Sequence, residues 1–175
     1  MSGNLRIEVF CDAAFRNLPD QISSGRGHII LLVDEKNWSA PIGWTSNKVK
    51  RVVGSTIAAE ALSLQMGLAH ASFLRAILTE MLGVDMYKIP IVASTDSNNL
   101  YQAIYSTKFV EDKKLRIDIA QIQEAVEKEN AEIKWVEAGN MIADCLTKKG
   151  AKSDMLMDTI KTGRLFQEAE KKRME

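Results

Sequence analysis

Four carboxylates occupy positions from which they could act together on metal ions. They stand at the ends or starts of predicted elements and are Asp12, Glu60, Asp96 and Asp144. Four such groups in one place repel one another unless cations neutralise them. Oxygen ligands without His or Cys favour Mg²⁺ or Mn²⁺ over zinc. Two such ions about 3.5–4 Å apart can flank a scissile phosphate, so this pattern points to phosphodiester hydrolysis.

The same four residues also have an ordinary structural explanation. The chain contains 23 acidic residues, and an aspartate at a strand exit or helix start is commonly a cap. Glu60 weakens that explanation, because a carboxylate among apolar neighbours needs a partner. Those neighbours are Ile57, Ala58, Ala59, Ala61 and Leu62. From periodicity and composition alone, both explanations stay open.

Apolar periodicity predicts the elements that must position the acids. Strands are expected at 5–11, 28–33, 41–46, 89–95 and 133–136, and helices at 55–82, 99–105, around 115–126, 140–150 and 153–163. This order indicates an α/β protein with a mixed sheet. Asp12 and Asp96 follow strands that should be neighbours, and sites of such sheets collect at the carboxyl ends of strands.

Several apolar, aromatic and small residues have a structural interpretation. In the long helix, the apolar residues that recur at helical spacing are Ile57, Ala61, Leu64, Leu68, Phe73, Ile77 and Met81. Trp44 and Trp135 lie on predicted strands, and core packing is the favoured interpretation for both. Cys11 and Cys145 are expected to be small packed residues rather than ligands, and His28 and His70 to be structural or exposed.

Composition excludes some classes of protein. At 175 residues, with 23 basic and 23 acidic side chains and 46% hydrophobic residues, the chain fits one domain without a strongly basic nucleic-acid-binding character. Its core should span about residues 5–165, followed by a polar tail at 166–175. Two cysteines and two histidines are too few for a disulfide framework or a zinc cage. No signal peptide or membrane span is predicted, so the expected location is intracellular.

Five motifs occur in a recognisable order. They are FCDAAF at 10–15, PIGWTSNK at 41–48, VGSTIAAEAL at 53–62, STDS at 94–97 and IADCLTK at 142–148. Together they resemble the ribonuclease H domains of copia-type LTR retrotransposon polyproteins, over roughly residues 7–165. The resemblance implies a ribonuclease H-like α/β fold, with a five-stranded mixed sheet of order 3-2-1-4-5 and helices on both faces.

The resemblance also implies an activity and its site. The expected reaction is endonucleolytic hydrolysis of the RNA strand of RNA–DNA hybrids by a two-metal mechanism, during retroelement reverse transcription. Asp12, Glu60, Asp96 and Asp144 would be the catalytic ligands of two Mg²⁺ ions, for which Mn²⁺ can substitute. The expected partners are the hybrid and an adjacent reverse transcriptase domain, with no membrane. The expected location is the cytoplasm or element-derived particles, with the nucleus as a further possibility.

The chain departs from cellular members of the family in two respects. Cellular members carry a loop histidine before the last aspartate, whereas no histidine follows His70 here; Glu137 is a candidate replacement. Some members also carry a basic protruding helix, for which residues 108–116 are too short. Weak activity of the isolated domain is therefore expected.

Candidate substrate contacts flank the acids. They are Ser97, Asn98, Asn99, Lys48, Lys50 and Lys148, with Arg51, Lys149 and Lys152 nearby. Turn chemistry and a solvated charged face are the ordinary alternatives for these residues. Two rival functions remain: a catalytically weak or domesticated module that binds nucleic acid or a partner, and a DNA-cutting nuclease of the same fold. The presence of all four acids, with Glu60 early in its helix, favours ribonuclease H.

Overall fold

A five-stranded mixed sheet forms the centre of the computed structural model, which describes residues 4–17, 23–106 and 110–165. Most of the predicted turn around residues 17–20 and the tail 166–175 lie outside these ranges. The strands are β1 (Arg6–Ala14), β2 (Gly25–Val33), β3 (Ser39–Lys48), β4 (Ile91–Thr95) and β5 (Ala131–Trp135). Their order, β3-β2-β1-β4-β5, confirms the predicted topology. β1, β2 and β3 pair antiparallel, and β4 lies parallel to both β1 and β5.

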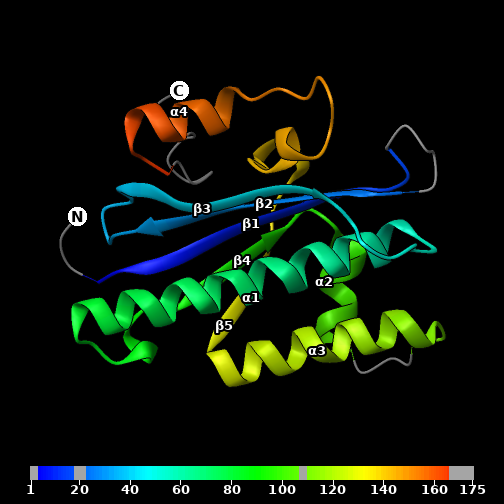
Figure 1. Cartoon of the computed structure of the whole chain (residues 1–175), viewed down its shortest axis with the longest axis horizontal. Helices are drawn as coiled ribbons and strands as arrows, with labels where there is room; N and C mark the ends of the chain where they lie inside the picture. Colours follow the sequence, from blue (N-terminus) through cyan, green and yellow to red (C-terminus); the bar gives the residue numbers. More distant parts are fainter. Residues whose placement is uncertain (1–3, 18–22, 107–109, 166–175) are drawn as a thin grey trace.

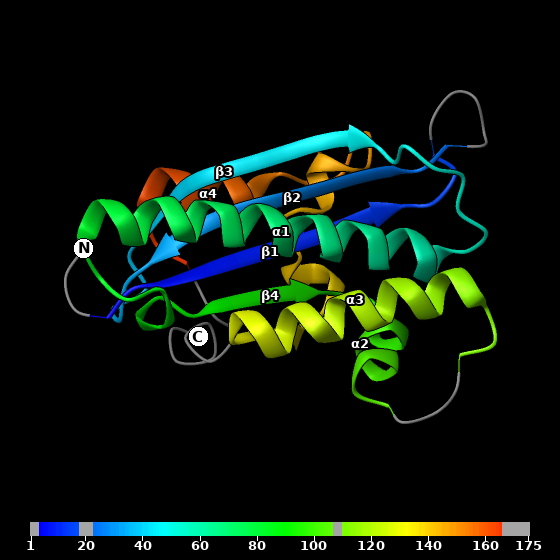
Figure 2. The same ribbon diagram turned by 60° about the horizontal axis from the view of Figure 1, so that its bottom comes forward.

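Helices cover both faces of this sheet, as predicted (Figure 1). The elements are α1 (Thr56–Leu82), α2 (Asn98–Tyr105), α3 (Lys113–Glu129), α4 (Asp154–Thr162) and the 3₁₀ turns η1 (Met86–Lys88), η2 (Ala138–Asn140) and η3 (Asp144–Leu146). α1, α2 and α3 lie on one face, and α4 and η3 lie on the other. Figure 2 shows that α1 runs the full length of the strands and extends past their ends.

Side-chain alternation along β1 supplies a core on each face. Ile7, Val9 and Cys11 pack in the larger cluster with α1, whereas Phe10 packs in the smaller cluster on the α4 side. Gly67 allows the close approach of α1, because a Cβ atom there would overlap Cys11 Sγ. The expectation that Cys11 is a small packed residue is therefore confirmed.

The boundaries of α1 match the sequence signals. Ser55 caps its start, where its side chain accepts a hydrogen bond from the Ala58 amide at 3.3 Å, and Gly83 ends it with φ 64°. The helix that this periodicity predicts is confirmed, but the apolar residues of its far half are not all buried, since Phe73 is 63% exposed and Met81 is 77% exposed. The five-residue step from Leu68 to Phe73 turns the apolar stripe by about 140° at roughly 100° per residue.

The helix predicted at 140–150 is also wrong. Two 3₁₀ turns, η2 and η3, form there instead. Hydrogen bonds join residues three apart, from the Leu146 amide to the Ala143 carbonyl at 2.9 Å and from the Thr147 amide to the Asp144 carbonyl at 3.1 Å. Other parts of the chain bind the carbonyls of Leu146 and Thr147, at 2.5 Å and 2.7 Å. The carbonyls of Leu146 and Thr147 thus accept from Ser46 and Asn17 rather than from amides four residues further along a helix.

The predictions that Trp44 and Trp135 are core residues are wrong. Trp44 is 68% exposed and Trp135 is 45% exposed. Each stands on an edge strand of the sheet, β3 or β5. The Trp135 indole Nε1 donates to the Asp96 carbonyl at 3.1 Å, so this residue braces the end of β4.

Among the described residues, α1 is the one helix whose length and composition would suit a membrane span. Its buried residues include the charged Glu60 and Arg75. The helix therefore serves as the core helix of this α/β domain.

Candidate metal centre

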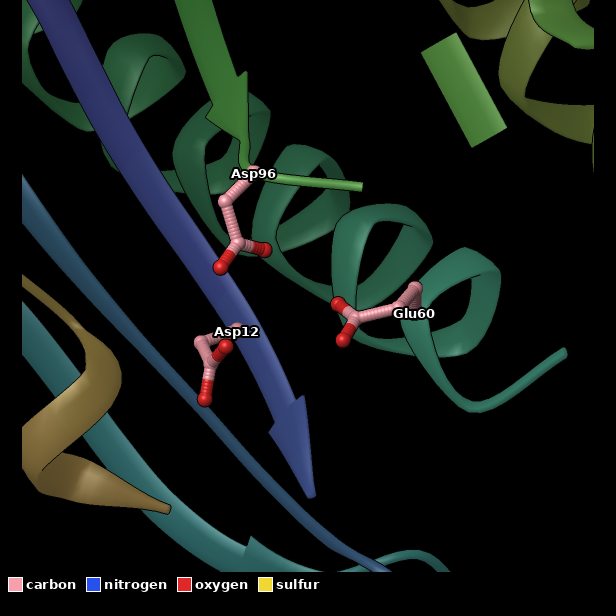
Figure 3. A group of neighbouring side chains, drawn as sticks. All are labelled: Asp12, Glu60 and Asp96. Atoms are coloured by element: carbon pink, nitrogen blue, oxygen red, sulfur yellow. The ribbon is translucent and has the colours of Figure 1, made fainter. Parts of the chain in front are cut away.

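Three of the four predicted acids converge at one end of the sheet (Figure 3). Asp12, Glu60 and Asp96 each offer a carboxylate oxygen, and these oxygens all lie within 4.8 Å of one another. The parallel register places Phe10 opposite Ser94, so Asp12 and Asp96 follow at the same end of neighbouring strands. Glu60 reaches the same point from the second turn of α1, and Figure 3 shows it facing the two aspartates.

Hydrogen bonds fasten α1 to β1 beside these carboxylates. The Ser63 hydroxyl, one turn after Glu60, donates to the Asp12 carbonyl at 2.7 Å. Ser63 is wholly buried, and Asp12 and Glu60 are 0% and 6% exposed. The positions of two acids from distant parts of the chain are thus fixed by the packing of a helix on a strand.

Burial and mutual repulsion raise the pKa values of all three groups. Loss of water around Glu60 raises its pKa to about 9, and the nearby Asp12 and Asp96 contribute to the rise. Asp12 rises to a pKa of about 6, mainly through burial, against the lowering effects of the Thr147 hydroxyl and the Lys148 ammonium. Burial also raises the pKa of Asp96. The cluster therefore favours bound protons or a bound cation over three free charges.

The residues present fit a divalent cation. Asp12 Oδ1 and Glu60 Oε2 are buried and have no hydrogen-bond partner among the described residues. Buried carboxylate oxygens without partners are costly unless something positive binds them. An all-oxygen donor set suits Mg²⁺ or Mn²⁺.

Asp144 lies beside the cluster rather than within it. It starts η3, and its carboxylate contacts the Lys148 ammonium, which also lies 3.6 Å from Asp12 Oδ1. Asp144 is close enough to raise the pKa values of Asp12 and Asp96. Its role as a fourth metal ligand stays a prediction.

The predicted substrate contacts lie around the cluster. Ser97 caps α2, since its hydroxyl accepts from the Leu100 amide at 3.4 Å, and Asn98 and Asn99 are exposed on the first turn of that helix. Lys48 ends β3 and Lys50 follows it, and both are exposed. Contacts of these five residues and of Lys148 with a substrate stay predictions, as does the replacement of the loop histidine by Glu137.

Two residues beside the acids were not singled out from the sequence. The Thr147 hydroxyl donates to Asp12 Oδ2, and the Asn17 side-chain amide donates to the Thr147 carbonyl at 2.7 Å. Thr147 lies inside the motif at 142–148, which is a signal that could have identified it. Asn17 carries no such signal, because its partner stands 130 residues further along the chain.

The two histidines and Cys145 lie outside the carboxylate cluster. His28 Nε2 and His70 Nδ1 are 2.9 Å apart, joining β2 to α1, and burial lowers the pKa of His28 to about 4. Cys145 is half-buried on the other face of the sheet, where it packs against the smaller apolar cluster. The structural role expected of these residues is confirmed.

Comparisons with known proteins agree with the fold and the motifs described above. No family model matches the chain. The chain is similar to the retrovirus-related Pol polyprotein from transposon RE1 of Arabidopsis thaliana, with 26% identity over 144 residues. These residues cover 82% of this chain but 9% of that polyprotein.

Solved structures with a similar fold include ribonuclease H domains. The N-terminal ribonuclease H domain of rv2228c from Mycobacterium tuberculosis has a TM-score of 0.59 and 16% identity, covering 91% of this chain and 96% of that one. LC11-RNase H1, in complex with an RNA/DNA hybrid, has a TM-score of 0.60 and 18% identity, covering 81% and 94%. RNase H1 of Halobacterium salinarum has a TM-score of 0.56 and 17% identity, covering 81% and 94%. The resemblance indicated by the motifs is thus confirmed: the chain has the ribonuclease H fold and is similar in sequence to part of a retrotransposon Pol polyprotein.

Proposed function

We propose that this chain is a ribonuclease H that hydrolyses the RNA strand of RNA–DNA hybrids with two divalent metal ions. The observation that carries the proposal is the pair of buried oxygens without a hydrogen-bond partner in the described part of the chain, Asp12 Oδ1 and Glu60 Oε2, within one carboxylate cluster. A purely structural acid would have its oxygens hydrogen-bonded. The known hybrid complex of LC11-RNase H1, which shares the fold, supports the choice of substrate.

Asp12, Glu60 and Asp96 would hold the ions, and Asp144 would join them as a fourth ligand. When bound, Mg²⁺ supplies Lewis-acid stabilisation of the phosphate and lowers the pKa of the attacking water. Burial of Asp12 and Glu60 keeps water away from the carboxylates and strengthens their interaction with a cation. Asn98 and Asn99 on α2, with Lys48, Lys50 and Lys148, would contact sugars and phosphates rather than bases.

The proposed setting is retroelement reverse transcription, next to a reverse transcriptase domain inside the cell. The similarity to a segment of a transposon Pol polyprotein supports this setting. No membrane partner is proposed, because α1 acts as the core helix of the domain.

Cleavage of labelled substrates tests the proposed reaction. The chain is incubated with an RNA–DNA hybrid, duplex DNA and duplex RNA, in Mg²⁺, Mn²⁺ or chelator. We expect the RNA strand of the hybrid alone to be cut, with no cutting in chelator. Asp96→Asn should abolish cutting, because it removes a carboxylate charge from the cluster.

Asp158→Asn is the matched control, since this exposed α4 aspartate lies outside the cluster and should leave cutting unchanged. An intact hybrid in both metals, at high enzyme concentration, would contradict the proposal. Hybrid binding without cleavage would instead favour the catalytically weak or domesticated module. Cutting of duplex DNA would favour the rival nuclease.

A further inference from the structure

The turn that follows η3 contacts Asp12 on β1. The Thr147 hydroxyl donates to Asp12 Oδ2, whereas Asp12 Oδ1 has no hydrogen-bond partner among the described residues. The hydroxyl also lies 3.1 Å from the Asp144 carbonyl, but it has one proton, and a carboxylate is the stronger acceptor. Thr147 thus engages one oxygen of Asp12 and leaves the other without a hydrogen bond from the described residues, 3.6 Å from the Lys148 ammonium.

The lack of a side chain at one position of β2, Gly27, makes the contact between Thr147 and Asp12 possible. Gly27 pairs with Asp12 in the β1–β2 register. A Cβ atom on Gly27 would lie 2.7 Å from Leu146 Cβ and 3.0 Å from Thr147 Cγ2. Any larger residue would push the turn away from Asp12.

Side chains from two other segments fix the turn in place. The Asn17 side-chain amide donates to the Thr147 carbonyl at 2.7 Å, while its oxygen accepts from the Gly25 amide at 2.9 Å. The Ser46 hydroxyl donates to the Leu146 carbonyl at 2.5 Å. The turn is therefore tied to the end of β1, the start of β2 and the end of β3.

We propose that Thr147 is a positioning residue that orients the Asp12 carboxylate for metal binding. Asn17 holds Thr147 in place, and the lack of a side chain at Gly27 leaves room for the turn beside Asp12. The inference rests on the proposed metal-dependent function. Residues that orient metal ligands in this way commonly contribute 10–100-fold to metal affinity, and Thr147 and Asn17 form such a chain.

Two variants of Thr147 separate positioning from packing. Thr147→Val keeps the shape and removes the donor, and Thr147→Ser keeps the donor. Mn²⁺ affinity is measured by electron paramagnetic resonance, and folding of the metal-free protein by thermal unfolding. We expect Thr147→Val to weaken Mn²⁺ binding on the order of 10–100-fold, with Thr147→Ser close to wild type. Equal affinities for wild type and Thr147→Val, or equal losses in both variants, would overturn the proposal.

Asn17→Ala provides a second measurement that leaves the hydroxyl in place. It should weaken Mn²⁺ affinity in the same direction, since it releases the turn from the end of β1. If Thr147→Val does not fold, unchanged Mn²⁺ affinity in Asn17→Ala overturns the proposal. These affinities are independent of hydrolysis, so an uncut hybrid would contradict the proposed reaction alone.

Discussion

Lys148 places a positive charge among the acids of the cluster. Its ammonium contacts Asp144, lies 3.6 Å from Asp12 Oδ1 and lowers the pKa values of Asp12, Glu60 and Asp96. Asp144, Asp12 and Asp96 in turn raise the pKa of Lys148. In this position the Lys148 ammonium offsets repulsion among the carboxylates of the metal-free protein. It also competes with a metal ion for the carboxylate oxygens.

Lys148→Met should therefore destabilise the metal-free protein and increase the stabilisation by Mg²⁺. The Lys148 side chain is 46% exposed, so the expected loss is about 1 kcal/mol, the size of one charge pair near water. Thermal unfolding in chelator and in saturating Mg²⁺ measures both effects. Lys149→Met serves as the control, because Lys149 is exposed and does not contribute to the pKa shifts of the cluster. An identical Mg²⁺-induced rise in Tm for the two variants would contradict this account.

Elements built from local signals were predictable, and those built from distant contacts were not. Ser55 and Gly83 set the two ends of α1 as expected, because each acts within one turn of the helix. The 3₁₀ turn η3 depends on Asn17 and Ser46, which are far away in the chain. Exposure of Trp44 likewise depends on β3 being an edge strand, which alternation within β3 does not reveal.

Candidate site residues follow the same division. The motifs identified Asp12, Glu60 and Asp96, and the parallel pairing of β1 with β4 brings the two aspartates together. Asn17 has no local signature, since its function depends on a partner that only the folded chain brings near. Polar residues that act through long-range hydrogen bonds are thus the part of the site that cannot be identified from a single sequence.

A buried ion pair joins α1 to the end of α3. The Arg75 side chain is 0% exposed, contacts the Glu129 carboxylate and donates to the Glu129 carbonyl at 2.6 Å. Its Nε has no hydrogen-bond partner among the described residues. The Glu129 side chain is 32% exposed, so water reaches the acid but not the base.

This asymmetry predicts which partner is costlier to remove. Glu129→Ala leaves a buried guanidinium without its counter-ion and should cost on the order of 3 kcal/mol. Arg75→Met leaves an acid that can be hydrated, and should cost about 1–2 kcal/mol. Urea unfolding of the two variants measures the difference. A larger loss for Arg75→Met would show that packing or the bond to the Glu129 carbonyl outweighs the unpaired charge.

At the scale of the whole molecule, the balance of charge depends on the cluster. The chain has 23 basic and 23 acidic residues and a formal net charge of zero. Two bound Mg²⁺ ions would add four positive charges where the hybrid is proposed to bind. Binding of a polyanion by such a neutral domain should depend on metal and weaken with salt. The protons that metal would displace also affect the stability of the whole domain.

Stability of the metal-free protein should fall as pH rises from about 5 to about 9. Glu60 has a pKa of about 9 in the folded protein against an ordinary value of 4.5, and Asp12 has a pKa of about 6 against 3.8. In this window the folded state binds more protons than the unfolded state, so the free energy of unfolding decreases with pH. One pKa unit corresponds to about 1.4 kcal/mol, so the loss across this window is expected to be on the order of 5–7 kcal/mol, most of it from Glu60.

Urea unfolding in chelator across this pH range measures the slope. Glu60→Gln should flatten it, because the amide does not titrate, whereas Asp158→Asn should keep it. Saturating Mg²⁺ should stabilise the wild-type protein more at high pH than at low pH, since the cation replaces protons on Glu60 and Asp12. Glu60→Gln should lose most of this stabilisation. If Glu60→Gln leaves the dependence of the unfolding free energy on pH unchanged, Glu60 does not take up a proton on folding. The three carboxylates would then not be the groups for which metal and protons compete.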